Sequence, residues 1–172
     1  MDATKRREKI IATINRDNTP ISASVLAKEL GVSRQVIVGD IALLRAQGHE
    51  IIATARGYMV PDYIGTNQYI GKIACCHNAE GTKEELYTIV DLGATVVNVI
   101  VEHELYGEIT GQLNINTRDD ADVFVNQLRL SEVKLLSALT LGVHLHTVAC
   151  RNKAHFAQVK DALDKAGFLV KD

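Results

Sequence analysis

The sequence predicts an α+β fold in two parts. In the first third, apolar residues recur at spacings of three and four, which predicts amphipathic helices. In the remainder, β-branched runs such as "ATVVNVIVE" (residues 94–102) alternate with capped helical segments, which predicts strands and helices in turn. The boundary is expected near "PDY" at 61–63, which gives predicted domains of 1–62 and 63–172.

The first part carries three helical segments. Ser22 and Ser33 are the expected N-caps of the second and third, because each stands just before an apolar periodic run. Gly31 and Gly48 are expected to follow the ends of these two helices. The side chains expected to be buried are, helix by helix, Ile10, Ile11 and Ile14; Val25, Leu26 and Leu30; and Ile37, Ile41 and Leu44.

The spacing between the second and third helices predicts a helix-turn-helix. Ala27, Gly31 and Ile37 follow the pattern A-x3-G-x5-I. The residue at 27 must be small where the third helix crosses it, Gly31 can supply a positive φ, and Ile37 anchors the third helix. An ordinary corner between two helices is the alternative. "EIIATARGYMV" then predicts two short strands around "TARG", so the first part is expected to be a winged helix-turn-helix that binds DNA.

The outward face of the third helix carries short side chains and is therefore suited to the major groove. Gly39 is unusual there, because a glycine inside a helix costs roughly 1 kcal/mol relative to alanine. A close approach of the backbone to DNA and neutral drift are the two explanations. Arg56, at the tip of the hairpin, is placed for a phosphate or the minor groove, or is a solvated turn residue. The residues expected at the DNA are Ser33, Arg34, Gln35, Val38, Gly39, Arg45 and Arg56.

The second part is predicted to contain a layer of helices on a mostly antiparallel sheet. The order of its segments is βαββαβ with an added helix and strand. Thr82, Thr117 and Asn152 are the expected N-caps of its helices. The expected strands are "QYIGKIACC", "ATVVNVIVE", "YGEITGQLNI", "HLHTVAC" and "FLVK", and the expected helices are "GTKEELYTIVDLG", "TRDDADVFVNQLR" and "NKAHFAQVKDALDKAG".

Two histidines stand in the apolar stretch "GVHLHTVAC" at 142–150. Side chains alternate along a strand, so His144 and His146 are expected on one face, roughly 7 Å apart. At that spacing two imidazoles can converge on one ion. Two satisfied core histidines are the equally weighted alternative.

A second segment offers partners for these histidines. His77 ends a predicted strand, and Glu85 lies in the first turn of the helix that follows. Together with His144 and His146 they would form a metal site of nitrogen and oxygen ligands, which suits zinc, nickel, iron or manganese. Cys75 is a rival ligand on the same strand face as His77, and Glu84 is the alternative carboxylate.

Composition bounds the class of protein. Residues 1–62 hold nine Lys and Arg against seven Asp and Glu (+2), and residues 63–172 hold ten against fourteen (−4), which together give the net charge of −2. Two modules with different partners are therefore expected. No apolar run is long enough to span a bilayer, a secretory signal is not expected at the start of the chain, and the three cysteines make no disulfide framework. A cytoplasmic protein without membrane contact is expected.

The sequence also resembles a known protein family. Over nearly its full length the chain resembles the niacin-responsive transcriptional repressors, in which a winged helix of the biotin-repressor type precedes a three-histidine (3H) domain. The resemblance is carried by "SRQVIVGDIALLRAQGHEIIATARGY", "HNAEGTKEELYTIVDLGATVVNVIVEHELYGEITGQL" and "LTLGVHLHTV". It implies that His77, Glu85, His144 and His146 bind a divalent metal. It also implies that nicotinic acid acts there as a co-repressor on genes of NAD synthesis or niacin uptake.

Three further residues are candidates for contact with the effector. Arg118 and Arg151 are each able to pair with a ligand carboxylate, or are solvated surface residues. His103 in "VEHELYGE" is a candidate neighbour of the site, or a loop histidine that caps a strand.

Two positions depart from the family pattern. Gly39 stands where a polar recognition residue is expected, which leaves the operator sequence open, and Leu141 stands where a small residue is usual, which bears on the floor of the pocket.

The sequence therefore predicts a dimeric repressor that is controlled by metal and nicotinic acid. Two copies on a palindromic operator are expected, because one wing and one helix cover few base pairs. A metalloenzyme acting on a nicotinamide-like substrate and a pure metal sensor are the alternatives. An enzyme is not expected, because Glu85 would serve as a ligand and only "EHE" at 102–104 remains as a source of a general base.

Overall fold

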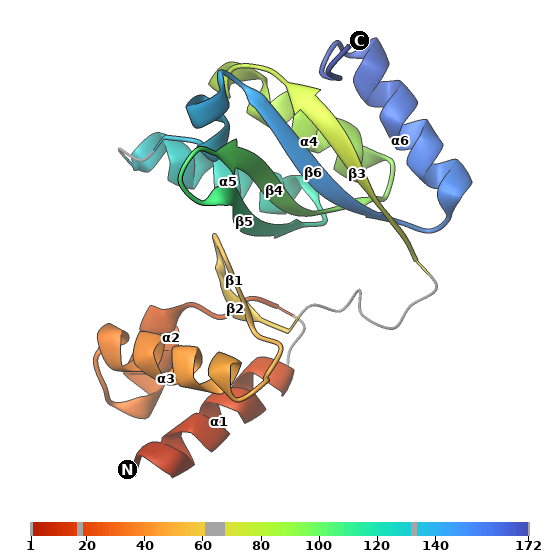
Figure 1. Cartoon of the computed structure of the whole chain (residues 1–172). Helices are drawn as coiled ribbons and strands as arrows, with labels where there is room; N and C mark the ends of the chain where they lie inside the picture. Colours follow the sequence, from red (N-terminus) through yellow and green to blue (C-terminus); the bar gives the residue numbers. More distant parts are fainter. Residues whose placement is uncertain (1, 17–18, 61–67, 132–133, 172) are drawn as a thin grey trace. The chain divides into compact units, whose positions relative to one another are not determined.

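A computed structural model describes residues 2–16, 19–60, 68–131 and 134–171 of the chain. The chain divides into two compact units, Met1–Ile64 and Gly65–Asp172, which are described separately (Figure 1). The boundary predicted at 61–63 lies outside the described residues. Among the helices of the described ranges, none has the length and apolar character needed to cross a membrane.

The first unit is three helices and a hairpin, as the sequence predicts. Ser22 Oγ accepts a hydrogen bond from the backbone N–H of Val25 (3.2 Å), and Ser33 Oγ accepts one from that of Val36 (3.3 Å). Gly31 adopts the left-handed conformation with a φ of 66°. The elements are α1 (Ala3–Arg16), α2 (Ala23–Leu30), α3 (Arg34–Ala46), β1 (Ile52–Thr54) and β2 (Gly57–Met59).

The core of this unit confirms most of the predicted apolar faces. Ala27 is buried, so α3 can cross α2 at that point, and Ile37 is fully buried. Val25 was expected in the core but is 46% exposed, and Ala23 takes its place. On a helix of 100° per residue, Ala23, Leu26 and Ala27 fall within one arc of about 100°, whereas Val25 lies on the opposite side of the helix from Ala23. The buried residues of this core are Ile10, Ile14, Ala23, Leu26, Ala27, Ile37, Ile41, Leu44 and Ile51.

A buried ion pair that no sequence pattern predicted joins α1 to α3. Arg6 donates from Nε to Asp40 Oδ2 (2.5 Å) and from Nη2 to Asp40 Oδ1 (3.3 Å), and Arg7 lies 3.4 Å from the same carboxylate. Asp40 is buried and stands three residues after Ile37 on the inner face of α3. A charged residue inside an apolar stripe is the signal that could have indicated the pair.

The hairpin is held against the segment before α2. Ile21 and Tyr58 exchange two backbone hydrogen bonds, of 2.9 Å and 2.8 Å. Gly57 lies beside them with a φ of 140°, and a Cβ placed there would stand 2.4 Å from the carbonyl carbon and oxygen of Ile21. Only glycine therefore fits this position without displacing the backbone.

The second unit is an antiparallel sheet of four strands in the order β3-β6-β4-β5. The helices α4, α5 and α6 cover one face of it (Figure 1), and one buried cluster includes side chains from all three helices and all four strands. The strands are β3 (Tyr69–Cys76), β4 (Thr95–His103), β5 (Gly107–Ile115) and β6 (Val143–Cys150). The helices are α4 (Thr82–Asp91), α5 (Arg118–Leu130) and α6 (Lys153–Lys165), with short 3-10 turns η1 (Ala79–Gly81) and η2 (Leu136–Thr140).

The strand predicted at "FLVK" is wrong in extent. Cys76 donates its backbone N–H to the carbonyl of Phe168 (2.8 Å), and Val170 donates to that of Ala74 (3.0 Å). These bonds form a single bridge at Leu169 rather than a strand. The segment is too short to extend the ladder, but it covers part of the outer edge of β3.

Candidate functional site

Three histidines from two separate segments surround one carboxylate in the second unit. His77 directly follows β3, and His144 and His146 belong to β6, which lies between β3 and β4. His144 pairs with Cys75 and His146 with Ile73 across the ladder, so both point toward the helical layer. Glu85 comes from the first turn of α4, on the side that faces the sheet.

The four side chains meet through the same ring nitrogen of each histidine. His77 Nε2 lies 2.5 Å and His144 Nε2 lies 2.9 Å from Glu85 Oε2, and His146 Nε2 lies 2.6 Å from Oε1. The ring centres of His144 and His146 are 4.7 Å apart, closer than the spacing along the strand predicts. Glu85 and the two strand histidines are buried, and His77 is half-buried.

The other ring nitrogen of each histidine is bound to the main chain. His77 Nδ1 donates to the carbonyl of Asn78 (2.6 Å), His144 Nδ1 to that of Gly142 (2.8 Å), and His146 Nδ1 to that of Asn98 (2.8 Å). A carbonyl oxygen only accepts, so each Nδ1 carries a hydrogen. This assignment leaves each Nε2 of a neutral ring with a lone pair.

Three lone pairs aimed at a carboxylate repel it unless positive charge lies between them. Three protons would supply that charge, but they would place three imidazolium ions around one carboxylate in a buried position, which is costly. One divalent cation supplies the charge at a single point. Histidines that bind a metal through one nitrogen and donate the other to a carbonyl or carboxylate are the usual arrangement. The donor set of His77, Glu85, His144 and His146 therefore fits a divalent transition metal.

The pKa values of Glu85, His77 and His146 are shifted by the interaction of these residues with one another. Burial on its own raises the pKa of Glu85, but the charge of His146 and hydrogen bonds from the three rings lower the pKa well below its ordinary value. Burial lowers the pKa of His77 and His146, but Glu85 raises both to above their ordinary value. Without metal, the protonated rings of His77 and His146 and the ionised carboxylate of Glu85 thus stabilise each other.

These shifts predict how the metal-free protein responds to pH. Because the pKa values of His77 and His146 are raised in the folded protein, these residues stabilise the fold below about pH 6.5. This contribution is lost as pH rises through their folded pKa values. Because the pKa of Glu85 is lowered in the folded protein, this residue stabilises the fold above about pH 4.3, and the contribution is lost in acid. Denaturation with chelator present should therefore give greatest stability between those limits. A metal-loaded sample should instead gain stability from pH 6 to 8, because metal competes with protons. Parallel curves for the two samples would contradict a metal at these residues.

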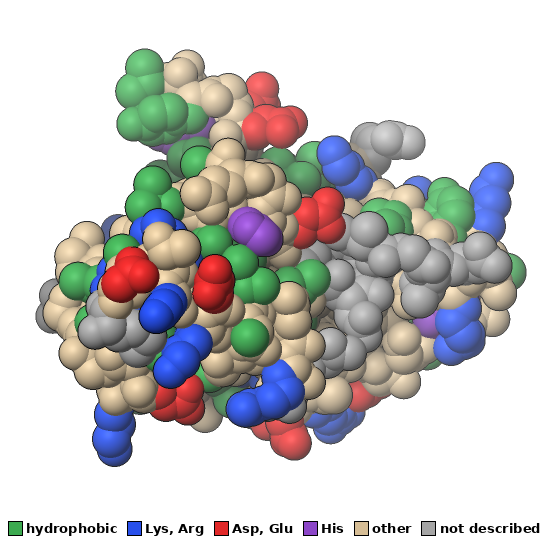
Figure 2. Space-filling view, turned by 90° about the horizontal axis from the view of Figure 1, so that it is seen from below, with side chains coloured by type: hydrophobic (Ala, Val, Ile, Leu, Met, Phe, Trp, Pro, Cys, Tyr) green, Lys and Arg blue, Asp and Glu red, His purple; other side chains and the backbone are tan. Residues whose placement is uncertain are grey.

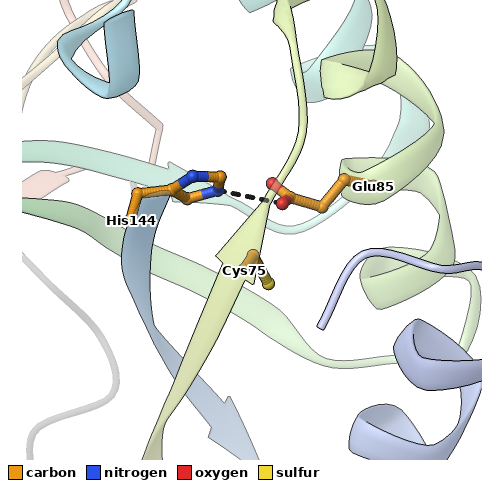
Figure 3. Close-up of side chains that lie close together, drawn as sticks. All are labelled: Cys75, Glu85 and His144. Carbon is orange, nitrogen blue, oxygen red and sulfur yellow. Dashed lines mark hydrogen bonds and ion pairs between the residues drawn. The ribbon is translucent and has the colours of Figure 1, made fainter. Parts of the chain in front are cut away.

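The two alternative ligands considered from the sequence, Cys75 and Glu84, differ in how close they lie to the site. Cys75 lies close enough to Glu85 and His144 that one atom of each falls within 4.8 Å of the others (Figure 3). Burial and then the charge of Glu85 raise the pKa of Cys75, which disfavours a thiolate in the metal-free protein. Glu84 is exposed, so Glu85 is the carboxylate that faces the histidines.

Two cavities adjoin the site. The larger has a volume of about 580 Å³, is mostly apolar, and is bordered by His77 and by Lys134. The smaller, about 30 Å³, is lined by Glu85, His144 and His146. Leu135 and Ser137 line both, so the two cavities adjoin at these residues. The remaining lining residues of the larger cavity are Asn78, Ala79, Leu128, Ala138, Leu141 and Gly142.

Thr82 was expected to cap α4 but does not. Asn78 caps the preceding 3-10 turn by accepting from Gly81 N–H (3.2 Å), and α4 then begins at Thr82 without a side-chain cap. Because the turn continues into the helix, Thr82 becomes its first residue and faces inward. Its side chain lines the smaller cavity. No sequence signal separated this arrangement from an ordinary N-cap.

Two of the three effector candidates lie away from the histidines. Arg118 donates to the carboxylate of Asp91 from Nε (2.7 Å) and Nη2 (2.5 Å). Asp91 follows Glu85 by six residues on α4, a rise of about 9 Å along the helix axis. Arg151 follows the far end of β6, seven residues from His144, about 23 Å along an extended strand. These two arginines lie away from the site. Arg118 follows β5 and Arg151 follows β6, each at the strand end that is farthest from the histidines.

His103 closes the turn between β4 and β5. Its Nδ1 accepts hydrogen bonds from the backbone N–H groups of Leu105 (3.1 Å) and Tyr106 (3.3 Å). It does not line either cavity beside the histidines. The arrangement is that of the loop histidine considered as the alternative.

The residues predicted to contact DNA lie mainly on the exposed side of α3. Arg34, Gln35, Gly39 and Arg45 are exposed, and Val38 is half-buried. The hydroxyl of Ser33 accepts the N-cap hydrogen bond and keeps its own hydrogen to donate, so the predicted contact with DNA stays a prediction. Arg56 stands in the turn between β1 and β2 and donates its N–H to Thr54 Oγ1 (3.3 Å). On the face drawn in Figure 2, Lys and Arg side chains are mixed with Asp and Glu rather than gathered in one patch.

Gly39 gives a prediction that separates its two explanations. No atom lies within 4 Å of a Cβ placed there, so the fold does not require glycine. Gly39→Ala should stabilise the first unit by about 1 kcal/mol and raise its Tm by about 4–8 °C. Operator binding should weaken if the backbone approaches DNA and remain unchanged if glycine is neutral. Ala42→Gly, on the same exposed face, is the matched control and should lower the Tm by a similar amount.

Comparison with known proteins finds two domain families in the chain. Residues 6–59 match an HTH domain, and residues 70–172 match the 3H domain. The transcription repressor NadR of Bacillus subtilis is 40% identical over 169 residues, which cover 97% of this chain and 94% of that protein. The probable transcription repressor NiaR of Thermotoga maritima is 39% identical over 168 residues, which cover 98% and 95%.

Proposed function

The chain belongs to the family of transcription repressors that join an HTH domain to a 3H domain, and from that premise we propose that it is a DNA-binding repressor controlled by nicotinic acid and a divalent metal. The observation that carries the proposal is the convergence of three Nε2 atoms on Glu85, with every Nδ1 held by the main chain. The metalloenzyme hypothesis is set aside, because this is a family of DNA-binding repressors and not of enzymes.

His77, Glu85, His144 and His146 would hold the metal. Zinc, nickel, iron and manganese all accept such a set of nitrogen and oxygen ligands. When bound, the metal would add positive charge beside the cavities and leave a position for an anionic ligand. The protein residues orient the rings, bury the carboxylate and keep the site beneath η2.

The larger cavity supports a small aromatic acid as the effector. Its volume of about 580 Å³ is within the range of ligand pockets, and Ala79, Leu128 and Ala138 provide apolar surface for a ring. Lys134 at its border adds a positive charge. Nicotinic acid, which the resemblance implies, combines a flat ring with a carboxylate and matches this lining.

Repression would require two copies of the chain. One helix and one wing read too few base pairs for strong specificity, so we expect a homodimer on a palindromic operator. The effector would act by favouring the arrangement of the two DNA-binding units that fits the operator, through its higher affinity for that state. NAD synthesis and niacin uptake genes are the expected targets.

A titration on the DNA upstream of the protein's own coding region tests the proposal. Fluorescence anisotropy would be measured with metal alone, nicotinic acid alone, both, and neither. We expect the tightest binding with both. Binding that depends on metal but ignores nicotinic acid would support a pure metal sensor instead. No DNA binding above a scrambled duplex in any condition would contradict the repressor itself.

A further inference from the structure

One polar atom beside the histidines has no partner. Thr82 Oγ1 is buried and makes no hydrogen bond within the described part of the chain, and the residue is 5% exposed. Burying a hydroxyl without a partner is costly, so such atoms in a native fold call for an explanation. Thr88, six residues later on α4, shows the ordinary solution, because its hydroxyl donates to the carbonyl of Glu84 (2.7 Å).

The unpartnered hydroxyl lies where the functional groups meet. Thr82 precedes Glu85 by three residues, so the two side chains share one face of α4. Both line the smaller cavity together with His144 and His146. At about 30 Å³ the cavity has room for one or two oxygen atoms but not for a pyridine ring. It adjoins the larger apolar cavity across Leu135 and Ser137.

The geometry points to Thr82 as the residue that recognises the carboxylate of the effector. The ring of nicotinic acid occupies the larger cavity, its carboxylate enters the smaller one, and Thr82 donates its hydroxyl hydrogen to a carboxylate oxygen. This assignment rests on the proposed function. A divalent metal held by the three histidines and Glu85 would supply the positive charge that allows a second carboxylate to lie near Glu85.

The charge of the ligand follows from this donor. A hydroxyl that donates beside a bound divalent metal would favour an ionised carboxylate over a neutral amide or an apolar substituent of similar size. Nicotinamide and 3-methylpyridine should therefore bind more weakly than nicotinic acid. In the protein without effector, the cavity has room for a water molecule in the same place.

The test uses the full-length, zinc-loaded protein and isothermal titration with nicotinic acid. Thr82→Val keeps the shape of the side chain and removes the hydroxyl. We expect its affinity to fall about tenfold or more, because hydrogen bonds to charged groups are the stronger kind. Thr82→Ser should restore most of the affinity, and Thr88→Val should leave it unchanged. Without effector, the Tm of Thr82→Val should equal or exceed that of the wild type, since an unpaired buried hydroxyl is lost.

The outcomes separate this inference from the proposed function. If the wild type fails to bind nicotinic acid, the proposed function fails and this inference with it. If the wild type binds and Thr82→Val binds equally well, only the role of Thr82 is overturned. A loss in Lys134→Ala without a loss in Thr82→Val would place the carboxylate at the border of the larger cavity, which also overturns it. Zinc affinity, measured by chelator competition, should be unchanged in Thr82→Val; a parallel loss would mean that Thr82 acts through the metal.

Discussion

Replacing His144 and His146 together by alanine will remove both metal binding and the response to nicotinic acid. The two rings supply two of the three imidazole nitrogens that converge on Glu85, at 2.9 Å and 2.6 Å. Loss of outer contacts alone costs about 10–100-fold in metal affinity, so loss of two ligands should cost more than about 100-fold. The measurement is metal affinity by chelator competition, followed by operator titration with metal and nicotinic acid.

Two further variants, one a control and one a second test of the site, make this result specific. His49→Ala removes an exposed histidine of the first unit and should change neither metal affinity nor the response. Glu85→Gln keeps the size of the buried side chain while it removes the charge, and should also lose metal. Basal binding to non-specific DNA should persist in the double variant, because the first unit has its own core. A double variant that still responds to nicotinic acid would show that the effector site lies elsewhere.

Gly57→Ala is expected to unfold the hairpin of the first unit and to abolish operator binding. A Cβ at this position would stand 2.4 Å from the carbonyl of Ile21, which itself accepts the bond from Tyr58 N–H. Neither backbone can move without breaking the exchange of two hydrogen bonds, and the φ of 140° is strained for alanine. A cost of several kcal/mol is expected, a large fraction of the stability of a small domain.

A second glycine provides the matched control for this variant. Gly48 also has a positive φ, of 96°, but no atom lies within 4 Å of a Cβ placed there. Gly48→Ala should therefore cost only the backbone strain, about 1 kcal/mol. Thermal unfolding and operator affinity would be compared for the two variants. Equal effects would mean that conformational strain, and not the contact with Ile21, decides the outcome at Gly57.

Local patterns in the sequence were sufficient for most of the fold. The caps at Ser22, Ser33, Thr117 and Asn152 form as predicted, because each depends only on residues within one turn. The alternation of His144 and His146 likewise follows from a period of two along one strand. His77 and Glu85 were added by the resemblance as well as by position. The ladder between β3 and β6 accounts for the proximity of His77 to His144, and the packing of α4 on the sheet brings Glu85 to both.

The errors arose where a residue depends on distant parts of the chain. Arg118 and Arg151 are charged residues near element ends, and only the topology decides which end of the sheet each one occupies. Thr82 has the form of an N-cap, but the turn before it is already capped by Asn78. Asp40 is paired with Arg6, thirty-four residues away, and no spacing rule reaches that far.

The three carbonyls that accept from the Nδ1 atoms belong to Asn78, Asn98 and Gly142, in three different segments. Each contributes an atom that every amino acid possesses, so the tautomers of the histidines are fixed by the path of the main chain and not by the identity of neighbouring side chains. The side chains of Asn78 and Asn98 accept other hydrogen bonds, from Gly81 N–H and Thr147 N–H, so they take no part in deciding which nitrogen faces Glu85. A backbone shift of one residue in any of the three segments would change it at once.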